Sequence, residues 1–258
     1  MAANEYSLDD VKKVFNEHWR PGWGSIASDE VLFVQDYIKR YQPKDFLEVG
    51  MASGLSGGLI SQMLDWNGGK TFTSIDYNDT FFGDTSKKNG FLIDEIYAGG
   101  SVAVDKRPFV IAPGLSDVNR RFDMCFIDAN HQHPWPLIDT LCVYPFLDNA
   151  KVMIHHDLKL YRNQDVVRGI GPKYLFDQFP ERTRDKSLAN DGNIFALTLG
   201  DVSFQELEDI AIGGFHLPWS LFAPLSRDMV DQVRSALIEY YSPKLVAAFD
   251  LALSRQNS

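Results

Sequence analysis

The stretch that decides the fold is Phe46-Leu47-Glu48-Val49-Gly50-Met51-Ala52-Ser53-Gly54-Leu55-Ser56. Its start is a short apolar run typical of a buried strand, and apolar residues from Leu55 to Leu64 recur at helical spacing. Gly50 and Gly54 allow a tight turn and a close backbone approach to a ligand, because glycine has no Cβ. The first turn of the following helix offers unpaired N–H groups to an anionic group. This order predicts a ligand-binding turn of an α/β sheet.

The chain after this turn supplies an acidic residue where a ribose would lie. A second apolar run, Thr71–Ile75, ends at Asp76, which lies 26 residues after Gly50. A carboxylate at this point can accept hydrogen bonds from ribose hydroxyls. The turn reads ExGxxxGxS and lacks the GxGxxG spacing of dinucleotide-binding proteins, so a nicotinamide oxidoreductase is disfavoured. The alternative interpretation is an unrelated α/β protein whose glycines serve only the geometry of the turn.

Short apolar runs continue to alternate with helical stretches. Further strands are expected at Phe109–Ala112, Met124–Ile127 and Lys151–His155, with Asn193–Leu199 as a late antiparallel strand at an edge. Strands separated by helices imply right-handed crossovers and a mostly parallel sheet. We therefore predict a Rossmann-like, doubly wound α/β fold with helical N- and C-terminal additions. Its expected parts are a helical cap over 1–43, a ligand-binding domain over 44–200 and a helical extension over 201–258.

Two serines mark the expected helix starts in the N-terminal cap. Ser7 with Asp10 three residues later has the spacing of a capping box, with Asp in place of the usual Glu or Gln. Ser28 precedes a second stretch with helical spacing and is expected to cap it.

Composition narrows the classes of partner. The chain has 258 residues, of which 45% are hydrophobic and 23% are charged, as in an ordinary globular protein. Its net charge of −10 disfavours nucleic acid, which needs a basic face. No apolar run reaches the roughly 20 residues of a membrane-spanning helix, and no secretion signal is found at the N-terminus. Cys125 and Cys142 lie in apolar contexts and form no CxxC pair, which favours a cytoplasmic protein.

A second group of polar residues follows the predicted fourth and fifth strands. Asp128 and His131 follow the fourth strand, and His156 and Asp157 follow the fifth. The carboxyl ends of adjacent parallel strands open onto one crevice, so we expect these four side chains to face one another. Asp128, His156 and Asp157 would suit a divalent cation that acidifies a substrate hydroxyl. His131 would take the hydroxyl proton as a general base.

This group has a simpler interpretation as well. A His–Asp pair at a strand end can be a hydrogen-bonded structural pair that holds no metal. His133 competes with His131 for the role of base, although it precedes Pro134 and is expected to face solvent. His155 is the last residue of its predicted strand and is expected in the core.

Several of these motifs together resemble a known family. The run FLEVGMASGLS is similar to the first motif of class I S-adenosylmethionine-dependent methyltransferases. TSIDYN, residues 73–78, resembles their second motif, and FDMCFIDANH, residues 122–131, resembles the motif of their fourth strand. Gly114-Leu115-Ser116-Asp117 stands where the family lines its adenine pocket. The resemblance implies that S-adenosylmethionine contacts Glu48, Gly50, Ala52, Gly54, Ser56, Asp76, Ser116 and Asp128.

The polar group resembles that of metal-dependent O-methyltransferases that act on sugar hydroxyls of natural products and polysaccharides. In that branch, residues matching Asp128 and Asp157 bind magnesium, and a residue matching His131 is the base. His156 departs from the pattern, because the corresponding residue is commonly acidic. An imidazole favours manganese, iron or zinc over magnesium.

The resemblance implies a methyl transfer from S-adenosylmethionine to a hydroxyl oxygen of a sugar or a glycosylated small molecule, assisted by a divalent metal. The alternatives are a metal-independent methyltransferase, one that acts on nitrogen, and a non-catalytic cofactor-binding protein. The expected partner is a small molecule or glycan, with neither nucleic acid nor membrane, and the helical flanks offer a surface for a homodimer.

Overall fold

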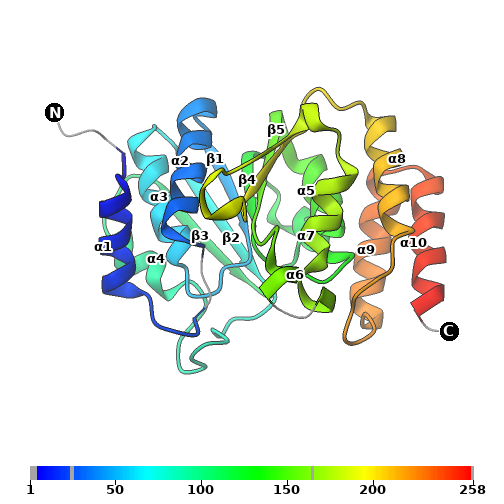
Figure 1. Ribbon diagram of the computed structural model, residues 1–258, viewed down its shortest axis with the longest axis horizontal. Helices are drawn as coiled ribbons and strands as arrows, with labels where there is room; N and C mark the ends of the chain where they lie inside the picture. Colours follow the sequence, from blue (N-terminus) through cyan, green and yellow to red (C-terminus); the bar gives the residue numbers. More distant parts are fainter. Residues whose placement is uncertain (1–4, 24–25, 164–165, 257–258) are drawn as a thin grey trace.

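In the part of the chain that the structure describes, seven strands form one mixed sheet through the centre of the molecule (Figure 1). The structure is a computed structural model that describes residues 5–23, 26–163 and 166–256. The strands lie in the order β3-β2-β1-β4-β5-β7-β6, with the bounds β1 Asp45–Val49, β2 Thr71–Asp76, β3 Ala103–Pro108, β4 Phe122–Ile127, β5 Leu147–His155, β6 Arg184–Lys186 and β7 Phe195–Thr198. Strands β1 to β5 pair in parallel, and β7 runs antiparallel to both β5 and β6. The predicted Rossmann-like, mostly parallel sheet is confirmed.

The order of the strands reverses between β1 and β4. From β1 the chain moves outward through β2 to β3, and it then returns to β4 on the other side of β1. The two strand ends stay joined at this point, because the Asp128 N–H donates a hydrogen bond to the carbonyl oxygen of Val49 (2.9 Å). In open α/β sheets, ligands bind outside the carboxyl ends of the strands where the order reverses. The residues after Val49 and Ile127 therefore frame the expected site.

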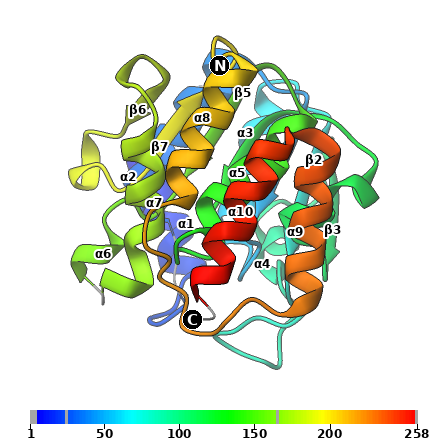
Figure 2. The same cartoon turned by 90° about the vertical axis from the view of Figure 1, so that its right-hand side faces the viewer.

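Helices cover both faces of the sheet (Figures 1 and 2). One face carries α1 Leu8–His18, α2 Ser28–Tyr41, α3 Leu55–Trp66 and α4 Phe91–Ile96. The other face carries α5 Trp135–Val143, α7 Val166–Gln178, α8 Phe204–Phe215, α9 Arg227–Tyr240 and α10 Pro243–Gln256. The short helix α6, Leu160–Asn163, follows β5. Helix α10 lies beside α8 and α9 in Figure 2, so the C-terminal additions form one layer.

The central strands β1 and β4 contribute to two hydrophobic cores, because successive side chains of a strand point to opposite faces of the sheet. Phe46 and Met124 pack in the core under α2 and α3. The residues that follow them, Leu47 and Cys125, pack in the core under α5 and the C-terminal helices. Cys125 and Cys142 are both buried free thiols, in agreement with their apolar sequence contexts.

Two predicted strands are wrong in position. The third strand is β3, residues 103–108, and not Phe109–Ala112. Because β3 is an edge strand with largely exposed polar residues, it has no apolar signal in the sequence. The predicted region Asn193–Leu199 does contain the antiparallel strand β7, but this strand is not at an edge, because β6 pairs with its outer side. Three charged residues form β6, and nothing in their pattern predicts a strand.

The N-terminal helices begin almost where predicted. The capping box of α1 is confirmed, since Ser7 and Asp10 exchange hydrogen bonds between side chain and backbone N–H (3.0 and 3.2 Å). The second helix is capped one residue earlier than predicted. The Ala27 N–H donates to the Glu30 carboxylate (2.6 Å), so Ser28 is the first residue of α2 and not its cap.

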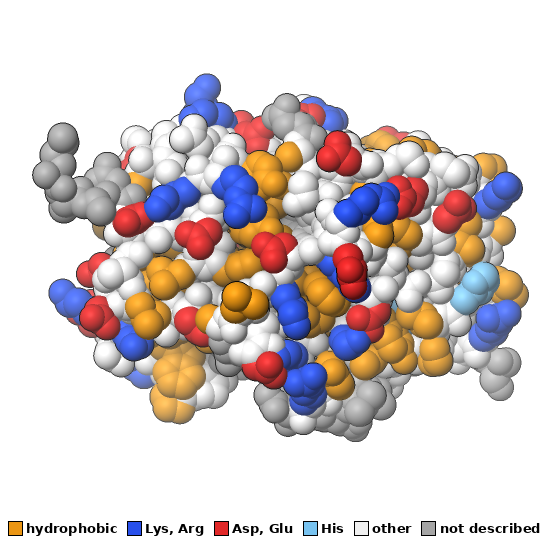
Figure 3. All heavy atoms as spheres, turned by 45° about the horizontal axis from the view of Figure 1, so that its top comes forward, with side chains coloured by type: hydrophobic (Ala, Val, Ile, Leu, Met, Phe, Trp, Pro, Cys, Tyr) orange, Lys and Arg blue, Asp and Glu red, His pale blue; other side chains and the backbone are white. Residues whose placement is uncertain are grey.

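Charged side chains of both signs lie on the surface. On the face shown in Figure 3, Lys and Arg side chains are interspersed with Asp and Glu. Among the described residues, no helix is both long and apolar enough to cross a membrane. The division of the chain into three parts at residues 43 and 200 stays a prediction.

Candidate active site

The turn between β1 and α3 packs against the segment that follows β4. Gly50 has a φ of +97°, and a Cβ there would lie 2.2 Å from the carbonyl oxygen of Asp128. Gly54 has a φ of +87° and directly precedes α3. The sequence predicts glycine at these positions for close approach to a ligand. In the structure, Gly50 is needed because its backbone packs directly against the backbone of Asp128.

Asp76 lies at the end of β2 and holds this turn in place. Its Oδ2 accepts hydrogen bonds from the backbone N–H groups of Met51 (2.9 Å) and Ala52 (3.2 Å). Its Oδ1 accepts one from Asn78 (2.9 Å). Ala52 needs this support, because its φ of +43° is unfavourable for a residue with a Cβ. Asp76 therefore lines the larger of two cavities around the turn and also fixes the shape of the turn, and its contact with a ribose stays a prediction.

Two neighbouring cavities open around the turn. The larger one has a volume of about 640 Å³, and Gly50, Asp76, Asp128 and Met229 are among the residues that line it. The smaller one has about 180 Å³ and is lined by the whole turn from Gly50 to Ser56, with Trp23, Ile26, His131, His156 and Asp157. Both cavities are lined by Gly50, Ala52, Phe82, Asp128 and Ala129. They therefore meet where the strand order reverses.

Two predicted cofactor-binding residues lie elsewhere. Glu48 is fully buried beneath the turn and lines neither cavity. Its carboxyl accepts hydrogen bonds from the hydroxyls of Ser56 (2.7 Å) and Ser74 (2.6 Å), and burial raises its pKa to about 8. Ser116 lines a separate hollow beside α9, because the chain after β3 first winds through a 3₁₀ segment, Ala112–Val118. Val110, Ile111 and Ala112 line the larger cavity instead.

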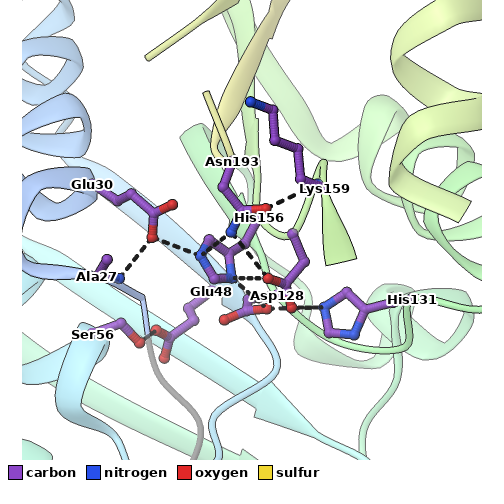
Figure 4. A network of polar contacts seen from close by, with 10 residues as sticks. Ala27, Glu30, Glu48, Ser56, Asp128, His131, His156, Lys159 and Asn193 are labelled. Carbon is purple, nitrogen blue, oxygen red and sulfur yellow. Dashed lines mark hydrogen bonds and ion pairs between the residues drawn. The ribbon is translucent and has the colours of Figure 1, made fainter. Parts of the chain in front are cut away.

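Four polar side chains converge beyond the ends of β4 and β5 (Figure 4). His131 Nε2 lies 3.1 Å from Asp128 Oδ1 and 3.2 Å from Asp157 Oδ2. His156 Nδ1 lies 3.3 Å from the same Asp128 oxygen and 3.4 Å from Asp157 Oδ1. The expectation that these four residues face one another is therefore met. We call them the His–Asp cluster.

The two carboxylates govern the charge of both imidazoles. Burial lowers the pKa of His131, but Asp128 and Asp157 outweigh this effect and raise that pKa above its ordinary value. Burial also lowers the pKa of His156, but the same carboxylates and Glu30 hold it well above its ordinary value. Both rings therefore favour the protonated form.

Glu30 is a member of the site that sequence reasoning missed. Its Oε2 lies 2.9 Å from His156 Nε2, and the two side chains are 1% and 5% exposed. In the sequence, Glu30 resembles any acidic residue in the first turn of a helix. Its distance of 126 residues from His156 leaves no local signal of the contact.

The remaining predicted histidines are structural. His133 is buried and not at the surface as expected, and its Nε2 lies 3.0 Å from the carbonyl oxygen of Gly214. Burial lowers its pKa to about 4. His155 lies in the core as predicted, where it stacks on Phe195 and burial lowers its pKa to about 3. Of these histidines, only His131 and His156 line the cavities.

Aromatic residues form one wall of the smaller cavity. Trp23 contacts Phe81 and Phe91 edge-on, with ring centroids 5.4 and 5.5 Å apart. Phe82 lines both cavities and is 68% exposed. Trp219, in contrast, packs in the core against Phe249.

Comparison with known proteins identifies this architecture. A family model described as a methyltransferase domain matches residues 47–158, which include the turn, Asp76 and the His–Asp cluster. No curated protein sequence matches the chain.

Solved structures share the fold at low sequence identity. The O-methyltransferase TomG from Streptomyces achromogenes, in complex with S-adenosylmethionine, is 15% identical and has a TM-score of 0.52. The alignment covers 75% of this chain and 90% of TomG. Cofactor-bound Rv0187 from MTB is 12% identical with a TM-score of 0.50, over 74% of this chain and 88% of that one. Residues 47–158 thus match a methyltransferase domain, and the expected resemblance to class I S-adenosylmethionine-dependent methyltransferases is confirmed by this match and by the shared fold.

Proposed function

We propose that this protein transfers the methyl group of S-adenosylmethionine to a hydroxyl oxygen of a small molecule. One observation carries the proposal: a cavity large enough for the cofactor meets a smaller cavity at Asp128, beside two imidazoles and two carboxylates. The cofactor-bound neighbours and the name of TomG support the cofactor and an oxygen acceptor.

The larger cavity fits the cofactor. Its volume lies within the roughly 300–1,000 Å³ of small-molecule sites. Asp76 offers lone pairs to the ribose hydroxyls, and Gly50 and Ala52, the residues of the turn that line this cavity, contact the amino acid end. Apolar side chains such as Ile111 and Met229 cover the base. When bound there, S-adenosylmethionine supplies an electrophilic methyl group on its sulfonium.

His131 is the proposed base. Its ring is 23% exposed and lines the smaller cavity, where an acceptor would lie. Asp128 and Asp157 both contact Nε2, so they fix the orientation of the ring. Because they also raise its pKa, the neutral form that accepts a proton grows as the pH rises. A cation beside these carboxylates would offset their effect and make His131 a base at lower pH.

The His–Asp cluster also fits a divalent cation. Asp128, Asp157 and His156 Nδ1 converge, and the outer nitrogen of His156 is held by a carboxylate, as is usual for a metal-binding imidazole. A cation bound there would acidify the acceptor hydroxyl. We therefore propose Asp128, His156 and Asp157 as its ligands.

A second ligand set competes with this one. Asp128, His131 and Asp157 each offer a ligand atom, and these atoms lie within 4.8 Å of one another. In that arrangement, His131 would bind the metal through Nε2 and could not act as the base.

The acceptor class is proposed from the aromatic wall. Exposed Phe82 and Trp23 border the smaller cavity, and aromatic faces stack well on sugar rings. We therefore propose a sugar or a glycosylated small molecule.

The test measures formation of S-adenosylhomocysteine with a panel of glycosides and phenols, before and after exhaustive chelation. Loss of turnover on chelation and recovery with a divalent cation would support the metal. Full turnover after chelation, with no metal detected, would mean that the cluster works without a metal, with His131 as the base and the two carboxylates as its hydrogen-bonding partners. His131→Ala separates the two ligand sets: if His131 is the base, metal affinity survives, whereas if it is a ligand, metal affinity falls. Failure of every hydroxylated acceptor, with turnover on an amine, would overturn the oxygen acceptor.

A further inference from the structure

We propose that Glu30, on the first turn of α2, is a positioning residue that holds His156 as a nitrogen ligand and thereby makes the His–Asp cluster select a transition-metal cation over magnesium. This inference rests on the proposed cation. It goes further by assigning a role to a residue outside the matched domain.

The contact between Glu30 and His156 determines which nitrogen of His156 faces the two carboxylates of the cluster. Glu30 Oε2 accepts a hydrogen bond from the Ala27 N–H (2.6 Å) and lies 2.9 Å from His156 Nε2. A carboxylate can only accept, so Nε2 must carry the proton that it donates. The other nitrogen, Nδ1, faces Asp128 and Asp157 and would become a ligand when a bound cation displaces its proton. Figure 4 shows Glu30 on one side of the imidazole and Asp128 on the other.

Burial makes this orientation rigid. The side chains of Glu30 and His156 are almost completely excluded from solvent, so water cannot replace either partner. Helix α2 is itself fixed, because Val31 and Val34 on its apolar face lie in the same core as the end of β5. The docking of α2 on the sheet therefore sets the position of Glu30 and, through it, of His156.

The ligand set decides the class of cation. Magnesium prefers oxygen ligands and retains several waters, whereas imidazole suits zinc, iron, manganese and related ions. With Nδ1 held toward Asp128 and Asp157, the set contains one nitrogen and two carboxylates. A second imidazole, His131, touches the same carboxylates. Without Glu30, the ring of His156 could turn away from the carboxylates, and the cluster would lose one of its two imidazole nitrogens.

The experiment measures metal binding to the full chain after removal of bound metal. Titration calorimetry with Mn²⁺ and with Mg²⁺ is run on the wild type, Glu30→Gln and Glu30→Ala. We expect the wild type to bind Mn²⁺ more tightly than Mg²⁺. In Glu30→Ala, Mn²⁺ affinity should fall by about 10- to 100-fold, the usual effect of losing a partner behind a metal ligand, with little change for Mg²⁺. Glu30→Gln keeps an oxygen for Nε2–H and should lose less.

A spectroscopic measurement tests directly whether His156 binds the cation through a ring nitrogen. Pulsed electron paramagnetic resonance of bound Mn²⁺ detects the nitrogen of a coordinated imidazole. In a His131→Ala background, this coupling can come from His156 alone among the cluster residues, so it should be present with Glu30 and lost in Glu30→Ala. If Glu30→Ala does not fold, the same comparison with Glu30→Gln decides, with a weakened coupling expected.

Gln35→Ala is the matched control. Gln35 is buried on the same helix, but its side chain contacts the backbone of Tyr6 and not the cluster. If Gln35→Ala lowers Mn²⁺ affinity as much as Glu30→Ala, the effect is general loosening of α2, and the inference is wrong. Equal Mn²⁺ affinity in the wild type and Glu30→Ala also overturns it. A wild type that binds neither cation overturns the proposed cation as well, whereas cofactor binding, measured separately, still tests the methyl transfer.

Discussion

A single added methyl group at Gly50 should break both the fold of the turn and cofactor binding. In Gly50→Ala, the new Cβ would meet the Asp128 carbonyl oxygen at 2.2 Å, its carbon at 2.7 Å and the Ala129 Cα at 3.1 Å. Backbone atoms cannot rotate away as a side chain can, so the turn and the segment after β4 must separate. That movement would strain or break the Asp128 N–H bond to Val49.

The expected magnitude follows from three contributions. An alanine at a φ of +97° costs about 1–2 kcal/mol, overpacking costs about 1–3 kcal/mol, and the backbone hydrogen bond contributes about 1 kcal/mol. The free energy of unfolding should therefore fall by about 3–6 kcal/mol, which for a chain of this size lowers the Tm by about 6–24 °C. Affinity for S-adenosylhomocysteine should fall by at least about tenfold, because the surface that holds the cofactor moves.

Gly99→Ala is the control. Gly99 has a similar φ of +77°, but nothing lies within 4 Å of a Cβ there. It should lose only about 1–2 kcal/mol of stability and bind S-adenosylhomocysteine as the wild type does. Chemical denaturation and titration calorimetry of both variants provide the comparison. Equal losses of stability and unchanged cofactor affinity in Gly50→Ala would refute the reasoning, because the close approach to Asp128 would then carry no cost.

Three further predictions concern single residues. Asp76→Ala should weaken S-adenosylhomocysteine binding by about 10- to 100-fold in titration calorimetry, since each charge-assisted hydrogen bond contributes about 1.5–3 kcal/mol; unchanged affinity would place the ribose elsewhere. His131→Ala should lower kcat by about 10²- to 10⁴-fold with cofactor affinity intact, and a large loss in His133→Ala instead would show that the wrong histidine was chosen. Asp139 is buried in the wall of the larger cavity, and burial raises its pKa to about 7. The folded state thus binds the proton more tightly than the unfolded state. The free energy of unfolding of the wild type, compared with that of Asp139→Asn, should therefore fall by up to about 1.4 kcal/mol per pH unit between pH values of about 4 and 7. Above this range, the difference between the two proteins should stay constant. Parallel stability curves for the two proteins across that range would contradict this assignment.

Local chemistry was sufficient to predict the central part of the fold. The run Phe46–Val49 and the helix from Leu55 could be predicted because both periodicities arise from neighbouring residues. Parallel pairing then implied that Asp128 and Asp157 would meet, since adjacent strands end at the same edge. The charged edge strands β3 and β6 could not be predicted in this way. Their positions depend on hydrogen bonds to a neighbouring strand, and a strand without a buried face leaves no apolar pattern.

The chemistry of the cluster was decided by contacts between distant segments. The sequence by itself determined that His156 follows the fifth strand, at a position where the resemblance to metal-dependent O-methyltransferases implies an acid. Only the docking of α2 determined which nitrogen of that ring faces the carboxylates, because the partner of the other nitrogen, Glu30, comes from 126 residues away. Glu48 likewise reads as a site residue in the sequence, but it is directed into the interior by the hydroxyls of Ser56 and Ser74. The order of residues in the sequence specifies which strand end a side chain follows. The direction of that side chain and its hydrogen-bond partners depend on the helices that pack around it, and no periodicity in the sequence records those contacts.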